Sequence, residues 1–138
     1  MTTEREIRTI LLVDDEAEIR EIYTEVLTDL GYKVIAEADG PSALSVIRQG
    51  AGIDLVITDL LMPGMDGLEF IRSLRAVLPS VPVIMVTAFS SVESYLQSFA
   101  LGVFEYVNKP VRIGEFERIV AAALDGSGKY QTFEDGRT

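Results

Sequence analysis

The sequence predicts an α/β fold in which helices cover both faces of a doubly wound parallel sheet. Two observations support this prediction: short apolar runs recur along the chain, and the segments between them carry the period of an amphipathic helix. The apolar runs are nearly continuous instead of alternating, which is typical of strands buried on both faces of a parallel sheet. The five predicted strands are residues 10–13, 33–36, 55–58, 83–86 and 104–107.

Helical segments follow the first two strands. Apolar residues recur at helical spacing across residues 19–30, and Gly31 is placed to end this helix. A Gly-Pro pair at residues 40–41 begins the second helix, because proline suits the first helical turn, and Leu44 and Ile47 then face inward.

A helix also follows each later strand, which gives five βα units in succession. The length of 138 residues fits one domain. We assign residues 1–124 to this domain and residues 125–138 to a polar C-terminal tail or linker. The apolar residues that mark the last three helices are Leu68, Ile71 and Leu74 for the third, Val92, Leu96 and Phe99 for the fourth, and Ile113, Phe116, Ile119, Val120 and Ala123 for the fifth.

The composition excludes several classes of chemistry. The chain has no His, no Cys and no Trp. The lack of Cys excludes disulfides, thiolate zinc sites and a cysteine nucleophile, and the lack of His excludes a Ser-His-Asp triad and a phosphohistidine on this chain. Any chemistry must therefore use carboxylates, hydroxyls, Lys or Arg, with a hard metal ion that prefers oxygen ligands.

The charge argues against binding to nucleic acid. The net charge is −10, and the 12 Lys and Arg residues are scattered, whereas nucleic-acid binding needs basic residues clustered on one face. No apolar stretch approaches the roughly 18 residues of a membrane span. The first residues lack both the basic region and the apolar core of a signal peptide. We expect a cytoplasmic protein with no membrane partner.

Reactive side chains gather where the predicted strands end. Asp14 and Asp15 follow the first strand, Asp59 the third, Thr87 the fourth and Lys109 the fifth. In such sheets ligands bind outside the carboxyl ends of the strands. Three converging carboxylates repel each other, and Mg²⁺ with its oxygen ligands resolves that repulsion. A lysine and a hydroxyl beside them describe a receptor for a phosphoryl group.

Each residue also has a purely structural interpretation. Asp14 and Asp15 suit a helix start, and Asp59 suits a turn before a loop whose glycines serve turns. Thr87 suits a strand, and Lys109 suits an exposed surface position. The combination, and no single residue, favours the phosphoryl-binding interpretation.

At this point the sequence resembles the receiver domain of bacterial two-component response regulators, including the chemotaxis regulators. The matching motifs are Ile-Leu-Leu-Val-Asp-Asp-Glu at 10–16, Asp-Leu-Leu-Met-Pro-Gly-Met-Asp-Gly at 59–67, Val-Thr-Ala at 86–88 and Tyr-Val-Asn-Lys-Pro at 106–110. The resemblance runs from about residue 9 to residue 124. It implies a flavodoxin-like fold with strand order 2-1-3-4-5.

The resemblance implies a metal site and a phosphoacceptor. Asp59 looks like the phosphoacceptor, which takes a phosphoryl group from the phosphohistidine of a partner. Asp15 resembles a direct Mg²⁺ ligand, together with Asp59 and the backbone carbonyl of Leu61. Asp14 resembles a ligand that acts through water. Mn²⁺ is expected to substitute for Mg²⁺.

The resemblance also implies a switch. Lys109, Thr87 and the backbone N–H of Ala88 would hold the phosphoryl oxygens, and the Lys109–Pro110 peptide bond is cis in this family. Thr87 would move toward the added charge, and Tyr106 would rotate into the space that it leaves. The affected surface would be the face formed by the fourth helix, the fifth strand and the fifth helix.

The expected function is a phosphorylation-activated signalling switch and not a turnover enzyme. Its expected partners are a sensor histidine kinase or phosphotransfer protein and a downstream protein or output domain; homodimerisation of the phosphorylated form is left open. The alternative is a pseudo-receiver that binds partners without phosphorylation. A flavodoxin-type cofactor site is disfavoured by the acidic residues after the first strand. A haloacid-dehalogenase-type phosphatase is disfavoured because Leu61 replaces the second aspartate.

Two further features allow a functional interpretation. The first helix carries an acidic stripe, which is either a solvated surface or part of a docking face for the kinase, since the family binds its kinase near this helix. Leu61 and Phe89 flank the predicted site and are apolar, from which we predict a long-lived phosphoryl state. The acidic stripe comprises Glu18, Glu21, Glu25 and Asp29.

Overall fold

The computed structural model describes residues 7–126 and confirms the predicted fold. The strands form one parallel sheet in the order β2-β1-β3-β4-β5, and the helices alternate with them along the chain. The strands are β1 (Thr9–Val13), β2 (Lys33–Glu37), β3 (Leu55–Thr58), β4 (Val83–Thr87) and β5 (Glu105–Asn108). The helices are α1 (Ala17–Asp29), α2 (Gly40–Arg48), α3 (Gly67–Val77), α4 (Val92–Ala100) and α5 (Ile113–Asp125).

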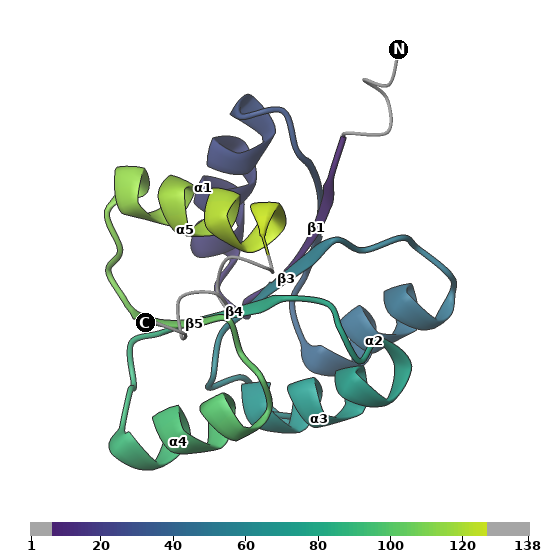
Figure 1. The fold of residues 1–138 in the computed structure, drawn as a ribbon, viewed down its shortest axis with the longest axis vertical. Helices are drawn as coiled ribbons and strands as arrows, with labels where there is room; N and C mark the ends of the chain where they lie inside the picture. Colours follow the sequence, from purple (N-terminus) through teal and green to yellow (C-terminus); the bar gives the residue numbers. More distant parts are fainter. Residues whose placement is uncertain (1–6, 127–138) are drawn as a thin grey trace.

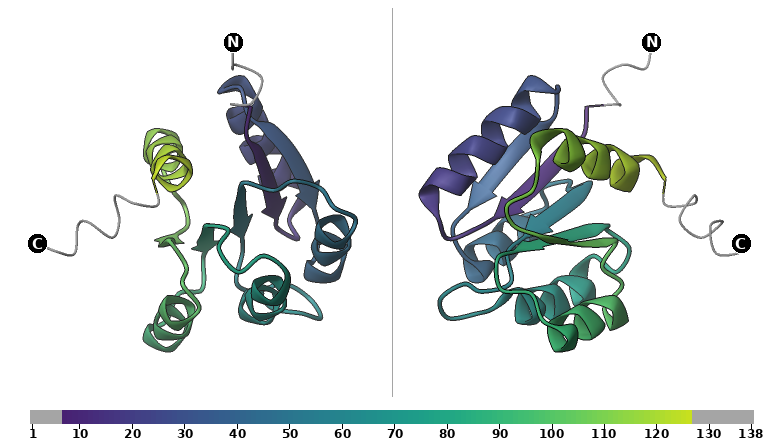
Figure 2. Two further views of the ribbon diagram at one scale, coloured as in Figure 1. Left: turned by 45° about the vertical axis from the view of Figure 1, so that its right-hand side comes forward. Right: turned by 90° about the vertical axis from the view of Figure 1, so that its left-hand side faces the viewer.

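Helices cover both faces of the sheet, with α1 and α5 on one face and α2, α3 and α4 on the other (Figure 1). The rotated views in Figure 2 show the same two helical layers. Each face has its own apolar core. Phe70 and Leu74 of α3 pack with Met85 in one core, and Tyr23 of α1 stacks on Phe116 of α5 in the other, with ring centroids 4.5 Å apart.

The strands differ in burial according to their position in the sheet. The side chains of β3 and β4 are buried throughout, and β1 is buried after its first residue, as the continuous apolar runs predict. Strands β2 and β5 are the two edges, and none of their residues is fully buried. The sequence pattern does not separate central from edge strands here, because apolar side chains occur in all five.

Helix α1 ends and helix α2 begins where the sequence predicts. After α1, Gly31 has a φ of +98°, and the N–H groups of Gly31 and Tyr32 donate to the carbonyls of Thr28 and Leu27. The carboxylate of Asp39 accepts the N–H of Ser42 and caps α2. Leu44 and Ile47 are buried against the sheet.

Helix α4 forms as predicted, but its apolar stripe faces outward. The side chains of Val92, Leu96 and Phe99 are 75%, 57% and 65% exposed. The buried positions are instead Ser94 and Ser98, whose hydroxyls donate to the backbone carbonyls of Ser91 and Tyr95, three residues earlier in each case. The helical spacing of apolar residues in the sequence therefore identified the helix, but it did not identify the face that packs against the sheet.

Helix α5 buries Phe116, Val120 and Ala123, whereas Ile113 in its first turn is 48% exposed. The helix ends at Asp125, one residue beyond the predicted domain boundary, and residues 127–138 of the predicted tail lie outside the described residues. Within residues 7–126 the helices are too short or too polar to cross a membrane.

Candidate functional site

The parallel sheet brings the predicted carboxylates together. Val13 of β1 lies beside Thr58 of β3 in register, so the residues that follow them, Asp14 and Asp59, emerge side by side at the carboxyl edge. One carboxylate oxygen from each of Asp14, Asp15 and Asp59 lies within 4.8 Å of the others. Asp14 and Asp59 are buried, and Asp15 is exposed. The site is thus open to solvent on the side of Asp15.

Lys109 joins the two buried carboxylates. Its Nζ donates to Oδ2 of Asp14 and to Oδ2 of Asp59, each at 2.9 Å, and lies 3.7 Å from Oε1 of Glu16. Burial alone would lower the pKa of Lys109, but its hydrogen bonds to the two carboxylates outweigh burial and raise the pKa. The lysine therefore stays charged. The Lys109–Pro110 peptide bond that follows it is cis.

The acidic groups carry more charge than the lysine offsets. Burial raises the pKa of Asp14 even though the Glu16 N–H and Lys109 donate to its carboxylate. Three carboxylates and one lysine leave a net negative charge around a set of oxygen atoms. Such a donor set fits Mg²⁺, which takes one or a few carboxylates and keeps several waters. Asp14, Asp15 and Asp59 are the clustered groups that could hold it.

Backbone and side-chain donors not predicted from the sequence fix the orientation of these acids. Oδ1 of Asp59 accepts the N–H of Leu60 at 2.6 Å, and Oδ1 of Asp14 accepts the N–H of Glu16 at 3.0 Å. Arg20 of α1 donates to the Asp14 carbonyl at 2.7 Å. Glu16 is adjacent to the acidic pair and could have been included, whereas no spacing rule connects Arg20 to a carbonyl six residues earlier.

Gly67 has a different role from the turn role that the sequence indicates. A Cβ at this position would lie 2.2 Å from the carbonyl oxygen of Asp59, and the Gly67 N–H donates to the carbonyl of Leu60 at 2.7 Å. Only a residue without a side chain allows α3 to begin so close to the Asp59 backbone. Gly64, with a φ of +84°, is the residue in this loop that serves a turn.

The two predicted switch residues are Thr87, the last residue of β4, and Tyr106, which lies within β5. Thr87 is fully buried, and its Oγ accepts the N–H of Phe89 at 3.0 Å. The hydroxyl of Tyr106 lies 2.5 Å from Oγ of Ser94 and accepts the N–H of Ser91 at 3.3 Å. Ser91 and Ser94 form the capping box of α4, so this tyrosine is linked to the start of that helix.

Ala88 follows Thr87 and is exposed. The ring of Tyr106 is half-buried and meets Tyr95 edge to face, with ring centroids 5.5 Å apart. The serine partners of Tyr106 were not identified from the sequence, because their pairing needs the fold to place α4 against β5. A Ser-x-x-Ser spacing before a helix was the only available signal.

The fold and the site together define a class: doubly wound α/β proteins with clustered carboxylates and a lysine at the carboxyl edge of the sheet. A sequence model described as response regulator receiver domain matches residues 10–121. The chain belongs to this family, the receiver domains of two-component signalling.

Solved structures of this family confirm the flavodoxin-like fold. A receiver domain protein of Methanospirillum hungatei JF-1, described as CheY-like, is 28% identical with a TM-score of 0.85, covering 90% of this chain and 98% of that one. Chemotaxis protein CheY4 of Vibrio cholerae is 32% identical with a TM-score of 0.77, covering 83% and 96% of the two chains.

A curated relative is the "Probable transcriptional regulator ycf27" of Porphyridium aerugineum, which is 40% identical over 115 residues. The match covers 83% of this chain and 47% of the relative. The chain therefore spans about half the length of this relative, and the remaining half has no counterpart in the match.

Proposed function

We propose that this receiver domain is a phosphorylation-activated switch whose phosphoacceptor is Asp59. The observation that carries the proposal is the position of Asp59, a buried carboxylate bonded to Lys109 and flanked by two further aspartates at the open edge of the sheet. A nucleophile, a fixed cation and a set of metal-ligating oxygens are what phosphoryl transfer requires.

In the proposed reaction, an oxygen of Asp59 attacks the phosphorus of a phosphohistidine on a partner kinase or phosphotransfer protein. The N–P bond breaks, and the imidazole leaves with its electron pair. Lys109, Thr87 and the N–H of Ala88 would then bind the phosphoryl oxygens. Bound Mg²⁺, held by Asp14, Asp15, Asp59 and the Leu61 carbonyl, would offset negative charge during transfer. Since the acceptor is a side chain of the protein itself, we do not class the chain as a turnover enzyme.

Phosphorylation would change the bonds that hold the start of α4. In the proposed movement toward the phosphoryl group, the Thr87 hydroxyl would release the N–H of Phe89. Tyr106 could then leave Ser91 and Ser94 and turn inward, which would release the cap of α4. The exposed apolar residues of α4 support this helix, with β5 and α5, as the surface whose affinity for an output domain or other downstream protein changes.

The proposal is tested with a small phosphodonor and Mg²⁺, followed by intact-mass measurement. We expect a hydroxylamine-labile adduct with the mass of one phosphoryl group on the wild-type chain and none on Asp59→Asn. Asp66→Asn is the matched control, because Asp66 caps α3 in the same loop and asparagine also serves as an N-cap. A folded wild-type chain that forms no adduct would support the pseudo-receiver alternative and contradict the proposal.

A further inference from the structure

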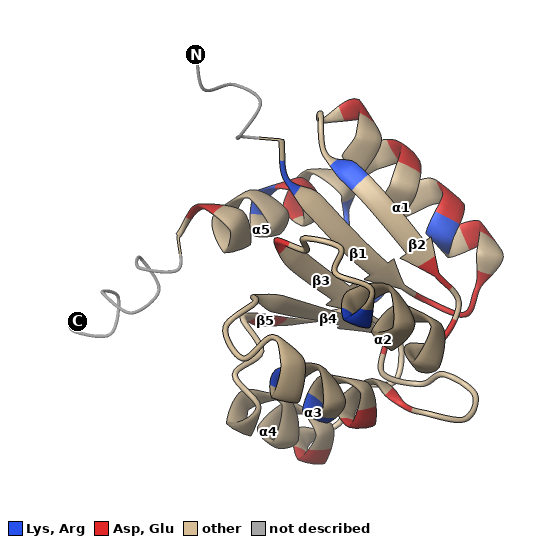
Figure 3. Ribbon diagram, turned by 90° about the vertical axis from the view of Figure 1, so that its right-hand side faces the viewer, with Lys and Arg blue, Asp and Glu red and all other residues tan. Residues whose placement is uncertain are grey.

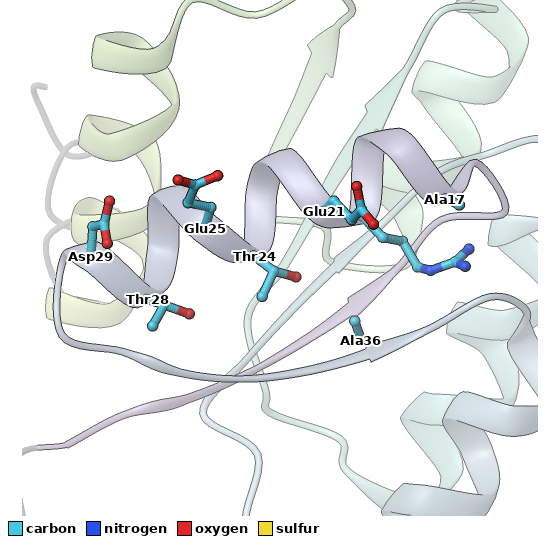
Figure 4. A pocket seen from close by; sticks show the side chains of 8 residues that line it. Ala17, Glu21, Thr24, Glu25, Thr28, Asp29 and Ala36 are labelled. Atoms are coloured by element: carbon cyan, nitrogen blue, oxygen red, sulfur yellow. The ribbon is translucent and has the colours of Figure 1, made fainter.

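A groove lies between α1 and strand β2, apart from the carboxylate site (Figure 4). Its volume is about 500 Å³. We propose that this groove binds an extended basic segment of a partner protein, which adds a strand to the open edge of β2. The groove is lined by Ala17, Arg20, Glu21, Thr24, Glu25, Thr28, Asp29 and Ala36.

Strand β2 offers unpaired backbone groups to such a segment. It pairs with β1 alone and ends the sheet on this side. The N–H of Lys33 donates to the carbonyl of Arg8, so the backbone groups of this residue and of every second residue after it face β1. The N–H and C=O groups of Val34 and Ala36 therefore point to the open edge, where an extended peptide can pair with them.

The groove combines an apolar floor with an acidic rim. Figure 4 shows Thr24 and Thr28 on the side of α1 that faces β2, and Ala36 on β2 toward the end of the groove where Glu21 lies. These side chains present methyl groups. The rim carries Glu25 and the other acids of the lining, which follow one another along α1 in Figure 3. Among residues 7–126 the ion pairs involve only Lys109, so these carboxylates have no cationic partner there.

Lysine and arginine side chains match this combination. Their methylene stems can lie over the threonine and alanine methyls while the charged heads reach the carboxylates. Arg20 lies at one end of the groove and donates to the carbonyl of Asp14, so the acidic half is the end near Thr28 and Asp29. A nucleic acid or an anionic lipid surface would be repelled by the same rim.

The test measures binding of a fluorescent peptide of alternating lysine and threonine by polarisation. We expect saturable binding that weakens about tenfold in Glu21→Gln/Glu25→Gln. The control variant Glu18→Gln/Glu93→Gln removes the same charge from exposed positions outside the groove and is expected to bind like wild type. A peptide of alternating lysine and proline, with equal charge but without alternate N–H donors, is expected to bind at least about tenfold more weakly.

Backbone pairing is tested separately from charge. Hydrogen exchange of the Val34 and Ala36 amides is expected to be fast in the free protein and to slow when the lysine–threonine peptide is bound. Ala36→Pro removes an outward N–H without removing a bond to β1, and we expect it to weaken binding. If this variant unfolds, Ala36→Lys tests the same position by placing a cation in the groove.

Three results would overturn the proposal: equal affinity of wild type and Glu21→Gln/Glu25→Gln, equal binding of the lysine–proline peptide, or unchanged exchange at Val34 and Ala36. None of these measurements depends on phosphorylation of Asp59. Failure of the groove proposal is therefore distinguishable from failure of the proposed switch.

Discussion

A single lysine sets the electrostatic state of the carboxylate site. Lys109 lies 2.9 Å from carboxylate oxygens of both Asp14 and Asp59, so the two buried acids share one cation. Their convergence could be predicted from sequence, because the carboxyl ends of parallel strands meet at one edge. The bridging position of the lysine could not, because a flexible four-carbon side chain takes its direction from the acids that the fold places around it.

Two apolar side chains next to the site lead to a prediction on the lifetime of the phosphorylated state. Leu61 and Phe89 are 48% and 64% exposed and lie two residues after Asp59 and Thr87 in the chain, and neither side chain can orient an attacking water. We expect Leu61→Asn, which adds an amide that can hold a water, to shorten the phosphoryl half-life by about tenfold. The measurement is loss of radiolabelled phosphate over time in Mg²⁺ buffer.

Leu61→Met is the control for this change, because it keeps the position apolar, and it should leave the lifetime near the wild-type value. A wild-type half-life of seconds would contradict the prediction of a long-lived state. Equal lifetimes for Leu61→Asn and Leu61→Met would show that this position does not control hydrolysis.

Glu105 on the edge strand β5 leads to a prediction on pH. Burial, and then the charge of Glu115, raise the pKa of Glu105 in the folded protein. A raised pKa favours the protonated form, so the contribution of Glu105 to stability is present below the pKa of the unfolded chain and is lost as the pH rises through the folded value. We therefore expect Glu105→Gln to stabilise the protein at pH 7, by about 0.5 kcal/mol or less because the residue is near the surface.

The measurement is urea unfolding of Glu105→Gln and wild type at several pH values. The difference in free energy of unfolding should disappear below about pH 4, where the wild-type glutamate is also uncharged. Glu93→Gln on the exposed side of α4 makes the same change of charge and serves as the control. A wild-type protein that is more stable than Glu105→Gln at pH 7 would contradict this assignment.

At the scale of elements, sequence periodicity located all five helices, but it did not predict how each one packs. For α3 the apolar stripe and the buried face agree, since Leu68, Ile71 and Leu74 are all buried. For α4 they disagree, because the inner face is occupied by Ser94 and Ser98, whose hydroxyls donate to backbone carbonyls three residues earlier. Helical period reports that one face is apolar, and it does not say whether that face meets the core or a partner.

The start of α3 leads to a prediction at this scale. In Gly67→Ala the added methyl would meet the carbonyl of Asp59 at 2.2 Å, so the helix or the acceptor loop must move. We expect a loss of about 2 kcal/mol in the free energy of unfolding and slower phosphorylation of Asp59. Urea unfolding and the rate of adduct formation are the two measurements.

Gly114→Ala in α5 is the matched control, because no atom lies within 4 Å of the methyl that it adds. Alanine favours the helix, so this variant should equal the wild type or exceed its stability by up to about 1 kcal/mol. If Gly67→Ala behaved like Gly114→Ala, close approach to the Asp59 backbone would not be the reason for glycine at position 67.

At the scale of the whole molecule, the order of the strands could be inferred only through the resemblance to a family. Alternation of strands and helices predicts a parallel sheet with helices on both faces, but several strand orders satisfy that pattern. Neither the alternation of strands and helices nor the family resemblance predicts the acidic groove beside β2, because this groove exists only where an edge strand and the neighbouring helix meet in space. The acidic stripe on α1 was visible in the sequence, but its proximity to unpaired backbone groups was not.

The protein has a net charge of −10, and we expect a divalent cation bound at the carboxylate cluster to stabilise the whole fold. The buried acids repel each other in the folded state, and an ion that binds only the folded protein adds RT ln(1 + [Mg²⁺]/Kd) to its stability. At ten times Kd this amounts to about 1.4 kcal/mol, measured by urea unfolding of protein stripped with EDTA. Ionic strength must be matched with KCl, because general screening also acts on an acidic protein.

Asp15→Asn separates site binding from general screening. Asp15 is the exposed member of the cluster, so its replacement removes one carboxylate without opening the core. We expect this variant to lose most of the stabilisation by Mg²⁺ at the same concentration. Glu18→Gln, which makes an equal change of charge on α1, should keep it. Equal stabilisation of the two variants would show that Mg²⁺ acts on the overall charge, and the assignment of the metal to the carboxylate cluster would then be wrong.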